Sequence, residues 1–288
     1  MPLALGATNI DKVYLGSTEV TKAYLGATLV YSSTPAHDSD AADIIARRGT
    51  AHGTPVTPAV ATAIDNAVKL MKTNGTWNAC GSLVVMAGAR SLTEALEPWK
   101  GPAPTSFNFV EDDLNFYTGL KGDASTKYLS ANLAPDDLGQ DDCHASYFCT
   151  EPSAISSARD IIGAAGGALP AKLRLEAQFT PTVRYFFRLQ SESFSSPSLI
   201  EGDDGLGFTG ATRNDATTAT LRADASNFSF TMNTSTPTDD TISVFRMSSE
   251  SFFSDVRLSM YSLGSHVDLA ALESSIESYM TEIGEIPE

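Results

Sequence analysis

Residues 106 to 263 alternate apolar and polar side chains with a period of two, and this pattern constrains the fold more than any other feature of the sequence. The run Lys172–Phe179 alternates without a break. A period of two places every second side chain on the same face of a β-strand. Short strands separated by turn residues predict a mainly β fold, an antiparallel β-sandwich of jelly-roll type. The other predicted strands cover residues 183–189, 218–223, 227–233, 241–247 and 255–261.

The chain after the last of these strands has a helical pattern. Asp268 is a suitable N-cap, and Gly284 is a suitable stop. We therefore expect a C-terminal helix that lies along the sandwich with one apolar face. That face consists of Leu269, Leu272, Ile276, Tyr279 and Ile283.

Residues 35–104 predict a small helical connector. Thr57 and Pro58 begin the better helix, whose apolar face (Val60, Ile64, Val68 and Met71) ends near Gly75. A shorter helix is expected over residues 38–48, ended by Gly49, and the apolar run within residues 77–86 is expected to pack against the helical face. Prolines at 98, 102 and 104 mark a linker into the body at 105–288.

A ten-residue repeat occupies the first 31 residues, with LGATNI at 5–10, LGSTEV at 15–20 and LGATLV at 25–30. Each unit predicts a strand, a tight turn at glycine and a second strand, so that three hairpins form a meander. A meander of about thirty residues is too small to bury a core by itself. It must pack either on its own downstream domain or on a larger assembly, and the residues alone leave both alternatives open.

Tandem units of the KVYLGSTEV type that end in LVY resemble the N-terminal segments of structural proteins from tailed bacteriophages, over residues 5–31. The segments 119–129 (GLKGDASTKYL), 253–264 and 279–284 resemble the concanavalin-A-like, or laminin-G-like, modules of such proteins. The first half of the body matches less well, and Ala124 stands where glycine is commoner in that motif.

The resemblance implies a non-enzymatic structural protein of the virion, either a head fibre or capsid decoration or a tail fibre. It would be made in the host bacterial cytoplasm, anchored through residues 1–34, and would display its jelly roll outward. The implied partners are other virion proteins and further copies of the chain, with a trimer favoured by analogy with phage fibres. A host-surface glycan is a further candidate partner. The expected anchoring residues are Tyr14, Leu15, Gly16, Val20, Tyr24, Leu25, Gly26, Val30 and Tyr31.

The charge of the chain argues against two classes of partner. With 35 acidic and 19 basic residues, the net charge is −16, which disfavours binding to nucleic acids and to anionic membranes. The sequence lacks an apolar stretch of membrane-spanning length, and its first twelve residues are not expected to act as a secretory signal. The cysteines Cys80, Cys143 and Cys149 are expected to be reduced thiols, because they form a sparse, odd set without a signal peptide. Zinc binding is not expected, because His144 is the only further ligand near Cys143 and Cys149.

Motifs for catalysis or cofactor binding are not found in the sequence, so we expect no enzyme activity and no cofactor. The alternative is a polysaccharide depolymerase on a concanavalin-like fold, which would need two carboxylates flanking the sugar bond. The acidic clusters lie in predicted loops, at 111–113, 136–137, 141–142, 201–204 and 239–240. These clusters are interpreted as solvated loops, with calcium binding as the alternative. Aromatic candidates for sugar binding are Tyr147, Tyr185 and Trp99, although aromatic residues on strands are usually core.

Overall fold

The computed structural model describes residues 37–155, 157–164, 173–179, 183–191, 204–247 and 252–286, together with short strands before residue 33. The chain divides into two compact units, Met1–Asp38 and Ser39–Glu288. The first is here called the hairpin unit and the second the body. Each is described by itself.

The hairpin unit contains three two-stranded antiparallel sheets. In the second hairpin Leu15 pairs with Thr18, which leaves two residues for the turn. The predicted hairpins are therefore confirmed, but the predicted continuous meander is wrong for the described strands, where pairing stays within each hairpin. The two strands of each of the first two hairpins are only two residues long and offer few backbone groups for a wider sheet. The strands are β1 (Ala4–Leu5), β2 (Thr8–Asn9), β3 (Tyr14–Leu15), β4 (Thr18–Glu19), β5 (Lys22–Leu25) and β6 (Thr28–Ser32).

The body is a sandwich of two antiparallel sheets, which confirms the predicted mainly β fold and its jelly-roll-like architecture. The inner sheet has eight strands in the order β18-β17-β16-β12-β20-β10-β9, with β7 also paired to β20. Its strands are β7 (Cys80–Val85), β9 (Leu114–Asn115), β10 (Gly119–Lys121), β12 (Cys143–Glu151), β16 (Gly207–Arg213), β17 (Thr218–Ala223), β18 (Ser226–Thr231) and β20 (Arg257–Gly264).

The outer sheet has six strands in the order β15-β14-β13-β19-β11-β8. The strands β11, β14 and β15 of this sheet, and β17 and β18 of the inner sheet, follow the alternating sequence pattern closely. One side of each of these strands faces the core and the other side does not. The strands of the outer sheet are β8 (Thr105–Phe107), β11 (Tyr128–Ser130), β13 (Arg159–Ala164), β14 (Leu173–Gln178), β15 (Arg184–Leu189) and β19 (Ser243–Val244).

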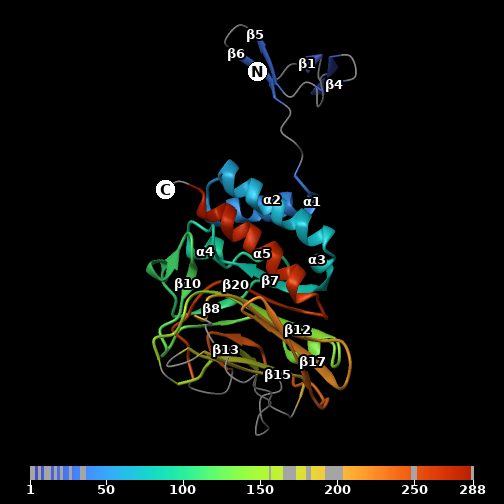
Figure 1. Cartoon of the computed structure of the whole chain (residues 1–288). Coiled ribbons are helices and arrows are strands. Elements are labelled where there is room, and N and C mark those ends of the chain that lie inside the picture. The colour runs from blue at the N-terminus through green and yellow to red at the C-terminus, as the bar shows by residue number, and fades with distance from the viewer. Residues whose placement is uncertain are drawn as a thin grey trace. The chain divides into compact units, whose positions relative to one another are not determined.

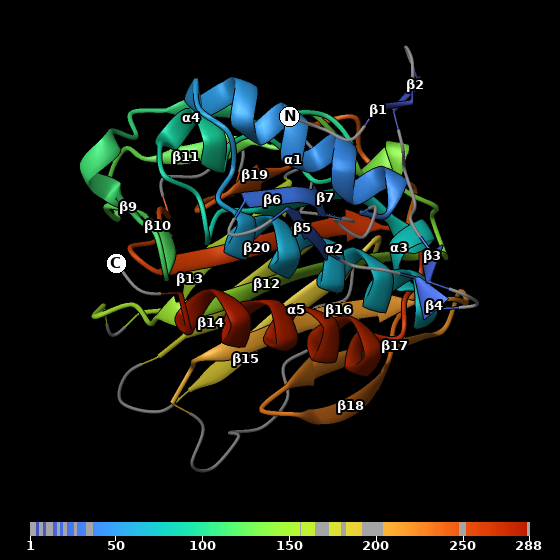
Figure 2. The same cartoon turned by 90° about the horizontal axis from the view of Figure 1, so that it is seen from above.

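Helices form a third layer on the inner sheet (Figures 1 and 2). One apolar core fills the space between the two sheets, and a second lies between the inner sheet and α1, α2 and α5. The expected C-terminal helix is confirmed, with the Asp268 carboxylate accepting hydrogen bonds from the first turn. The helices are α1 (Ser39–His52), α2 (Pro58–Thr73), α3 (Thr76–Ala79), α4 (Leu92–Ala95) and α5 (Leu269–Gly284), with 3-10 turns η1 (Glu111–Asp113) and η2 (Pro135–Asp137).

The predicted division at residues 104/105 does not match the structure, because residues 39–288 form one unit. The apolar run before it contains β7, a strand of the inner sheet, where Leu83 and Val85 face the helices and Val84 faces the core between the sheets. A strand buried on both faces has an uninterrupted apolar sequence, which resembles a buried helix. In addition, α1 continues past Gly49 to His52 instead of ending there.

Two of the three body segments that carry the family resemblance, 119–129 and 253–264, lie side by side, because β10 pairs with β20 through Leu120 and Leu258. A Cβ at Gly122 would lie 2.0 Å from the Ser254 carbonyl oxygen, so this glycine permits close backbone approach. Ala124 has a φ of 58°, in the left-handed region that favours glycine. The substitution at this position of the motif therefore retains the turn at a conformational cost.

Candidate functional site

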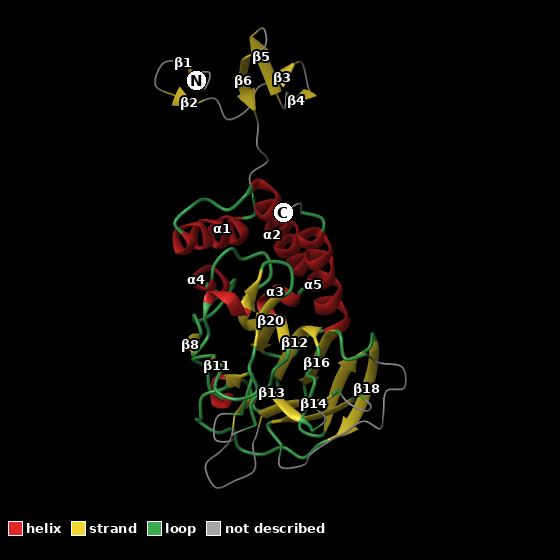
Figure 3. Ribbon diagram, turned by 90° about the vertical axis from the view of Figure 1, so that its left-hand side faces the viewer, coloured by secondary structure: helices red, strands yellow, loops and turns green. Residues whose placement is uncertain are grey.

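The helices α1, α2 and α5 all pack on the inner sheet, so none of them lies over the side of the outer sheet that points away from the core (Figure 3). On β14, the buried Leu173, Leu175 and Ala177 alternate with partly exposed polar residues. Their cross-strand partners on β15 alternate in the same way. We call the side of the sheet that these polar residues occupy the outer face. From β14 and β15 it carries Arg174, Glu176, Gln178, Arg184, Phe186 and Arg188.

A stack of three flat groups stands at the other end of this sheet. Phe107 and Tyr128 are cross-strand partners, and their rings are parallel within 4° with centroids 4.3 Å apart. The guanidinium carbon of Arg246 lies 3.4 Å from the centroid of the Tyr128 ring. Two groups this close cannot share one face of a ring, so Tyr128 lies between Phe107 and Arg246. Phe107 is the outermost member and is 37% exposed.

An unusual backbone conformation precedes the arginine of this stack. Phe245 has a φ of 71° although its side chain is fully buried, and bulky residues rarely adopt that region. Its N–H donates to the Ile161 carbonyl at 2.7 Å, and its own carbonyl accepts from Ser254 N–H at 2.8 Å. These bonds hold the kink, which lets Phe245 remain in the core while Arg246 reaches the Tyr128 ring. Strained backbone of this kind persists where the surrounding structure over-determines it.

Two carboxylates also meet on the outer face, which the sequence pattern did not reveal. Asp160 and Glu176 are cross-strand partners on β13 and β14. Arg174 joins them, because its Nη2 lies 3.1 Å from an oxygen of each carboxylate. Asp160 is fully buried. A carboxylate that acts on a sugar bond must reach it, so this arrangement is better suited to holding the two strands together than to catalysis.

The arginines divide into two groups by their partners. Each arginine outside the outer sheet has a carboxylate within 4.0 Å, whereas Arg159, Arg184 and Arg246 have none within the part of the chain that the structure describes. Burial and the neighbouring Arg174 lower the pKa of Arg188, while Glu176 raises it. Positive charge is therefore concentrated on the outer sheet of a chain whose net charge is −16. The paired arginines are Arg47, Arg48, Arg90, Arg213, Arg222 and Arg257.

The aromatic residues that the sequence suggested for sugar binding do not form a site. Tyr147, Tyr185 and Trp99 are each at most 2% exposed and belong to the two cores. The Trp99 ring instead packs edge-on against Tyr279, at a centroid distance of 4.9 Å. The most exposed aromatic residues of the described structure are Phe107, on the short strand β8, and Phe252, in the loop before β20, where period-two alternation gives little guidance.

The acidic loop residues mostly cap turns. Asp113 accepts a hydrogen bond from Val110 N–H at 2.8 Å, and Asp137 accepts one from Ala134 N–H at 2.8 Å. Asp142 accepts from His266 N–H at 2.6 Å. Among the described residues, no group of three or more His, Cys, Asp or Glu side chains is placed to hold a metal ion. Of the cluster at 201–204, only Asp204 lies within the described residues.

The cysteines and His144 are buried inside the body. Burial raises the pKa of both Cys80 and Cys143 to about 12, so these thiols stay protonated. The Nδ1 of His144 donates to the Ser265 carbonyl, and its Nε2 accepts from the Ser262 hydroxyl at 2.9 Å. This imidazole is thus a neutral structural group on β12.

We expect His144 to make the fold sensitive to acid. Burial lowers its pKa to about 4, from 6.5 in the unfolded chain. Because the unfolded chain takes up the proton first, this stability is complete above about pH 6.5 and is lost as the pH falls towards 4, by about 3 kcal/mol. Denaturant unfolding at several pH values should show a shallower slope in this window for His144→Gln. His37→Gln serves as the control and should keep the wild-type slope; equal slopes for all three chains would contradict the assignment.

The expected anchoring residues fall partly within the described strands. Tyr14 and Leu15 lie on β3, and Tyr24 and Leu25 lie on β5. Val30 and Tyr31 lie on β6, where Tyr31 pairs with Ala23 and the register is irregular between Ala23 and Tyr24. The remaining three, Gly16, Val20 and Gly26, lie outside the described residues.

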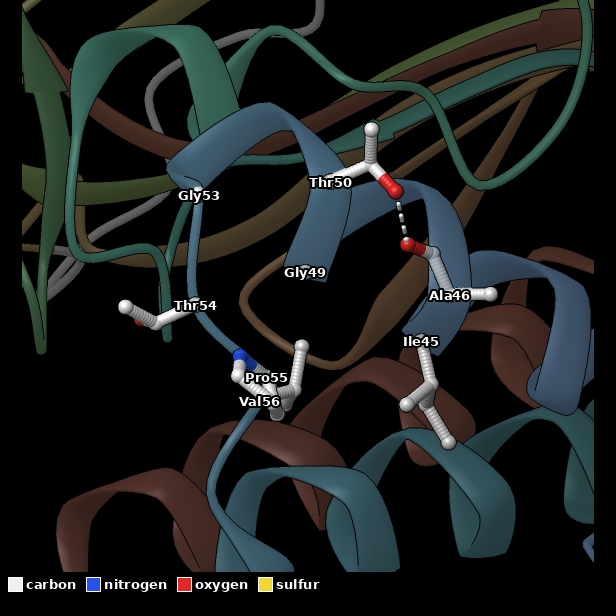
Figure 4. Close-up of a pocket in the computed structure, with 8 residues that line it drawn as sticks. All are labelled: Ile45, Ala46, Gly49, Thr50, Gly53, Thr54, Pro55 and Val56. Carbon is white, nitrogen blue, oxygen red and sulfur yellow. Dashed lines mark hydrogen bonds between the residues drawn. The ribbon is translucent and has the colours of Figure 1, made fainter.

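A hollow of about 570 Å³ lies beside the C-terminal half of α1 (Figure 4). Its walls come from that helix and the loop that follows, and none of the side chains that line it is charged. Thr50 turns its hydroxyl back to the Ala46 carbonyl at 3.0 Å. The hollow therefore lacks groups for acid–base chemistry or for holding a charged ligand. Its lining consists of Ile45, Ala46, Gly49, Thr50, Gly53, Thr54, Pro55 and Val56.

These features define a jelly-roll-like antiparallel β-sandwich with one helix-covered sheet and one sheet without helices over its outer face. No known family model matches the sequence, and no curated protein matches it significantly. Among solved structures, the chain is similar to Trypanosoma rangeli sialidase in complex with sialic acid, with a TM-score of 0.49 and 11% identity over 78% of this chain and 40% of that one.

It is also similar to the Botulinum neurotoxin serotype D binding domain, with a TM-score of 0.42 and 11% identity over 73% of this chain and 52% of that one. An arabinofuranosidase complexed with arabinofuranosyl-alpha-1,2-xylobiose gives a TM-score of 0.41 and 10% identity over 62% of this chain and 42% of that one. The chain thus spans about half, or less, of the length of these structures. They include both enzymes and a binding domain. None of the described helices is long and apolar enough to cross a membrane.

Proposed function

We propose that this chain is a structural protein of a tailed-bacteriophage particle, anchored by its hairpin unit and displaying its body outward to bind glycans. One observation carries the proposal: the described strands of the hairpin unit pair only within their own hairpins, and the unit is compact separately from the body. A two-stranded hairpin is marginally stable in water, and the longer strands of the third hairpin, β5 and β6, have outer edges that offer backbone groups to a neighbouring chain. A larger scaffold would therefore stabilise this unit, as the repeat resemblance also implies.

The body suits the display role because it contains large apolar cores of its own. Two apolar cores lie wholly within residues 41–283. The outer face carries the exposed Phe107 ring, stacked through Tyr128 on Arg246, at one edge of the sheet and Arg184 and Arg188 at the other. An aromatic ring that stacks on a sugar, together with polar donors, is an arrangement suited to glycan binding. Several copies, with three favoured, would raise the avidity for a surface that carries many glycans.

Binding without cleavage is the form of the proposal that the outer face supports. Two carboxylates of the described part of this face, Asp160 and Glu176, are both held by Arg174, and Asp160 is fully buried. The alternative is a depolymerase, which would release reducing ends or unsaturated products from host polysaccharide. We expect neither product from the purified chain.

Deleting residues 1–38 should leave a folded body that is missing from purified particles. The test supplies this variant, or the full chain, to a phage that lacks its own copy, and measures the protein in purified particles by immunoblotting. Full-length Phe107→Ala, altered only on the body, serves as the control and should incorporate normally. Incorporation of the deleted chain at the level of the full chain would contradict the anchoring role.

A further inference from the structure

We infer that the outer face binds an anionic glycan, with Arg184, Arg188 and Arg246 contacting its carboxylate or sulfate groups and the Phe107–Tyr128 stack contacting its sugar rings. The inference rests on the proposed glycan binding and adds the chemical class of the ligand.

Acidic residues outnumber basic ones by 35 to 19, so a carboxylate is available near most positions of the chain. Each arginine outside the outer sheet has such a carboxylate partner, whereas Arg184 and Arg246 lack one within the described structure. A polyanion approaching the body is repelled by most of its surface and attracted to this sheet. The charge of the molecule therefore favours an anionic ligand at this one face.

The spacing of the arginines suits a chain with repeated charges better than a single small anion. Arg184 and Arg188 point outward from the same strand, β15, with Phe186 between them. At about 3.3 Å per residue their Cα atoms are roughly 13 Å apart. Both are on the exposed side of an edge strand. The repeated anionic groups of a carboxylate-bearing or sulfate-bearing polysaccharide can pair with successive arginines of this row, because the planar guanidinium binds either group.

The aromatic stack provides the contact that a plain polyanion cannot use. Arg246 occupies one face of the Tyr128 ring and Phe107 occupies the other. The face of the Phe107 ring that points away from Tyr128 therefore remains available for stacking on a sugar, at the edge strand β8. Phe253 lies 5.5 Å from the Arg246 guanidinium and restricts it from another side. Arg246 is therefore pre-organised beside a ring surface, which lowers the entropy that binding would otherwise lose.

The experiment measures binding of the full chain to four immobilised polymers by biolayer interferometry: polygalacturonate, dextran sulfate, neutral dextran and polyglutamate. We expect the chain to bind at least one of the two anionic glycans, and the affinity to fall as salt rises. The preferred one distinguishes carboxylate from sulfate recognition. Arg184→Gln and Arg246→Gln should each lower that affinity by about tenfold. Arg47→Gln, which removes an ion-paired arginine of the helical layer, should leave it unchanged.

Three results would overturn the inference. Binding to dextran with the same affinity, unchanged by Arg184→Gln, would refute the anionic class while leaving glycan binding intact. Equal binding to polyglutamate would show that charge alone is recognised and that the stack plays no part. An absence of binding to all four polymers would count against the proposed glycan binding itself. Thermal melting of each variant separates a lost contact from a lost fold. If Arg246→Gln disturbs the Tyr128 stack, the exposed Arg184 still allows the test, because its replacement does not touch that stack.

Discussion

Replacing Glu94 with alanine is expected to lower the free energy of unfolding of the body by about 3–5 kcal/mol, the typical cost of removing one partner of a buried ion pair. Glu94 is fully buried on the short helix α4. It accepts hydrogen bonds from the backbone N–H of Arg90 at 2.9 Å and from the Arg90 Nε at 3.0 Å. The Arg48 Nε, also fully buried, lies 3.5 Å away. Without Glu94, the Arg48 charge would remain in the interior with its nearest counter-charge removed.

The effect should extend to the loop after α1. Arg90 also donates to the Thr54 hydroxyl at 3.2 Å and to the Pro55 carbonyl at 2.7 Å, so Glu94 orients the side chain that fastens this loop. The matched control is Glu97→Ala, which removes a partly exposed partner of Arg47 and should cost about 1 kcal/mol or less. Denaturant unfolding of both variants makes the comparison. Equal losses for Glu94→Ala and Glu97→Ala would contradict the importance of the buried network.

The second large effect is expected at Gly119, where alanine should cost about 3 kcal/mol or more. Gly119 begins β10 with a φ of +88°, and an added Cβ would lie 2.1 Å from the Leu258 carbonyl oxygen. The left-handed backbone alone costs an L-residue roughly 1–2 kcal/mol. The steric overlap adds about 1–3 kcal/mol, because β10 must move away from β20. Chemical denaturation and the protection of β20 amides against hydrogen exchange should both report the change.

Gly207→Ala separates the two contributions at Gly119. Gly207 has nearly the same φ, +85°, but an added Cβ meets no atom within 4 Å. Its substitution should therefore cost only the conformational part, roughly 1–2 kcal/mol. If the two alanine variants lose the same stability, the close approach of β10 and β20 has no energetic importance and the explanation for glycine in the GLKGD motif is wrong.

The sequence predicted best those strands and helices that have one face in the core and the other face in solvent. The strands β14, β15, β17 and β18 agree with the predicted runs to within two residues, and α5 begins and ends as its capping residues indicate. The prediction failed at β7, because an inner-sheet strand with helices on its other side has no polar alternation. The sequence of β7 does contain one useful signal, its short uninterrupted apolar run from Leu83.

The candidate site was less accessible to sequence reasoning. The outward residues Arg174, Arg184 and Arg188 occupy the polar positions of correctly predicted strands, so their common face could have been inferred. The stack of Phe107, Tyr128 and Arg246 could not, because it joins three segments distant in sequence and depends on a left-handed kink before Arg246. Residues in such conformations carry no periodic signal.

The most direct test of the account is electron cryo-microscopy of intact particles, with the body marked by an antibody fragment. We predict density in which the hairpin unit is embedded in another virion protein, its strand edges paired with that neighbour, while the body projects outward with its outer face accessible. Particles that lack the protein, or in which the body is enclosed and the hairpins are free in solvent, would contradict it.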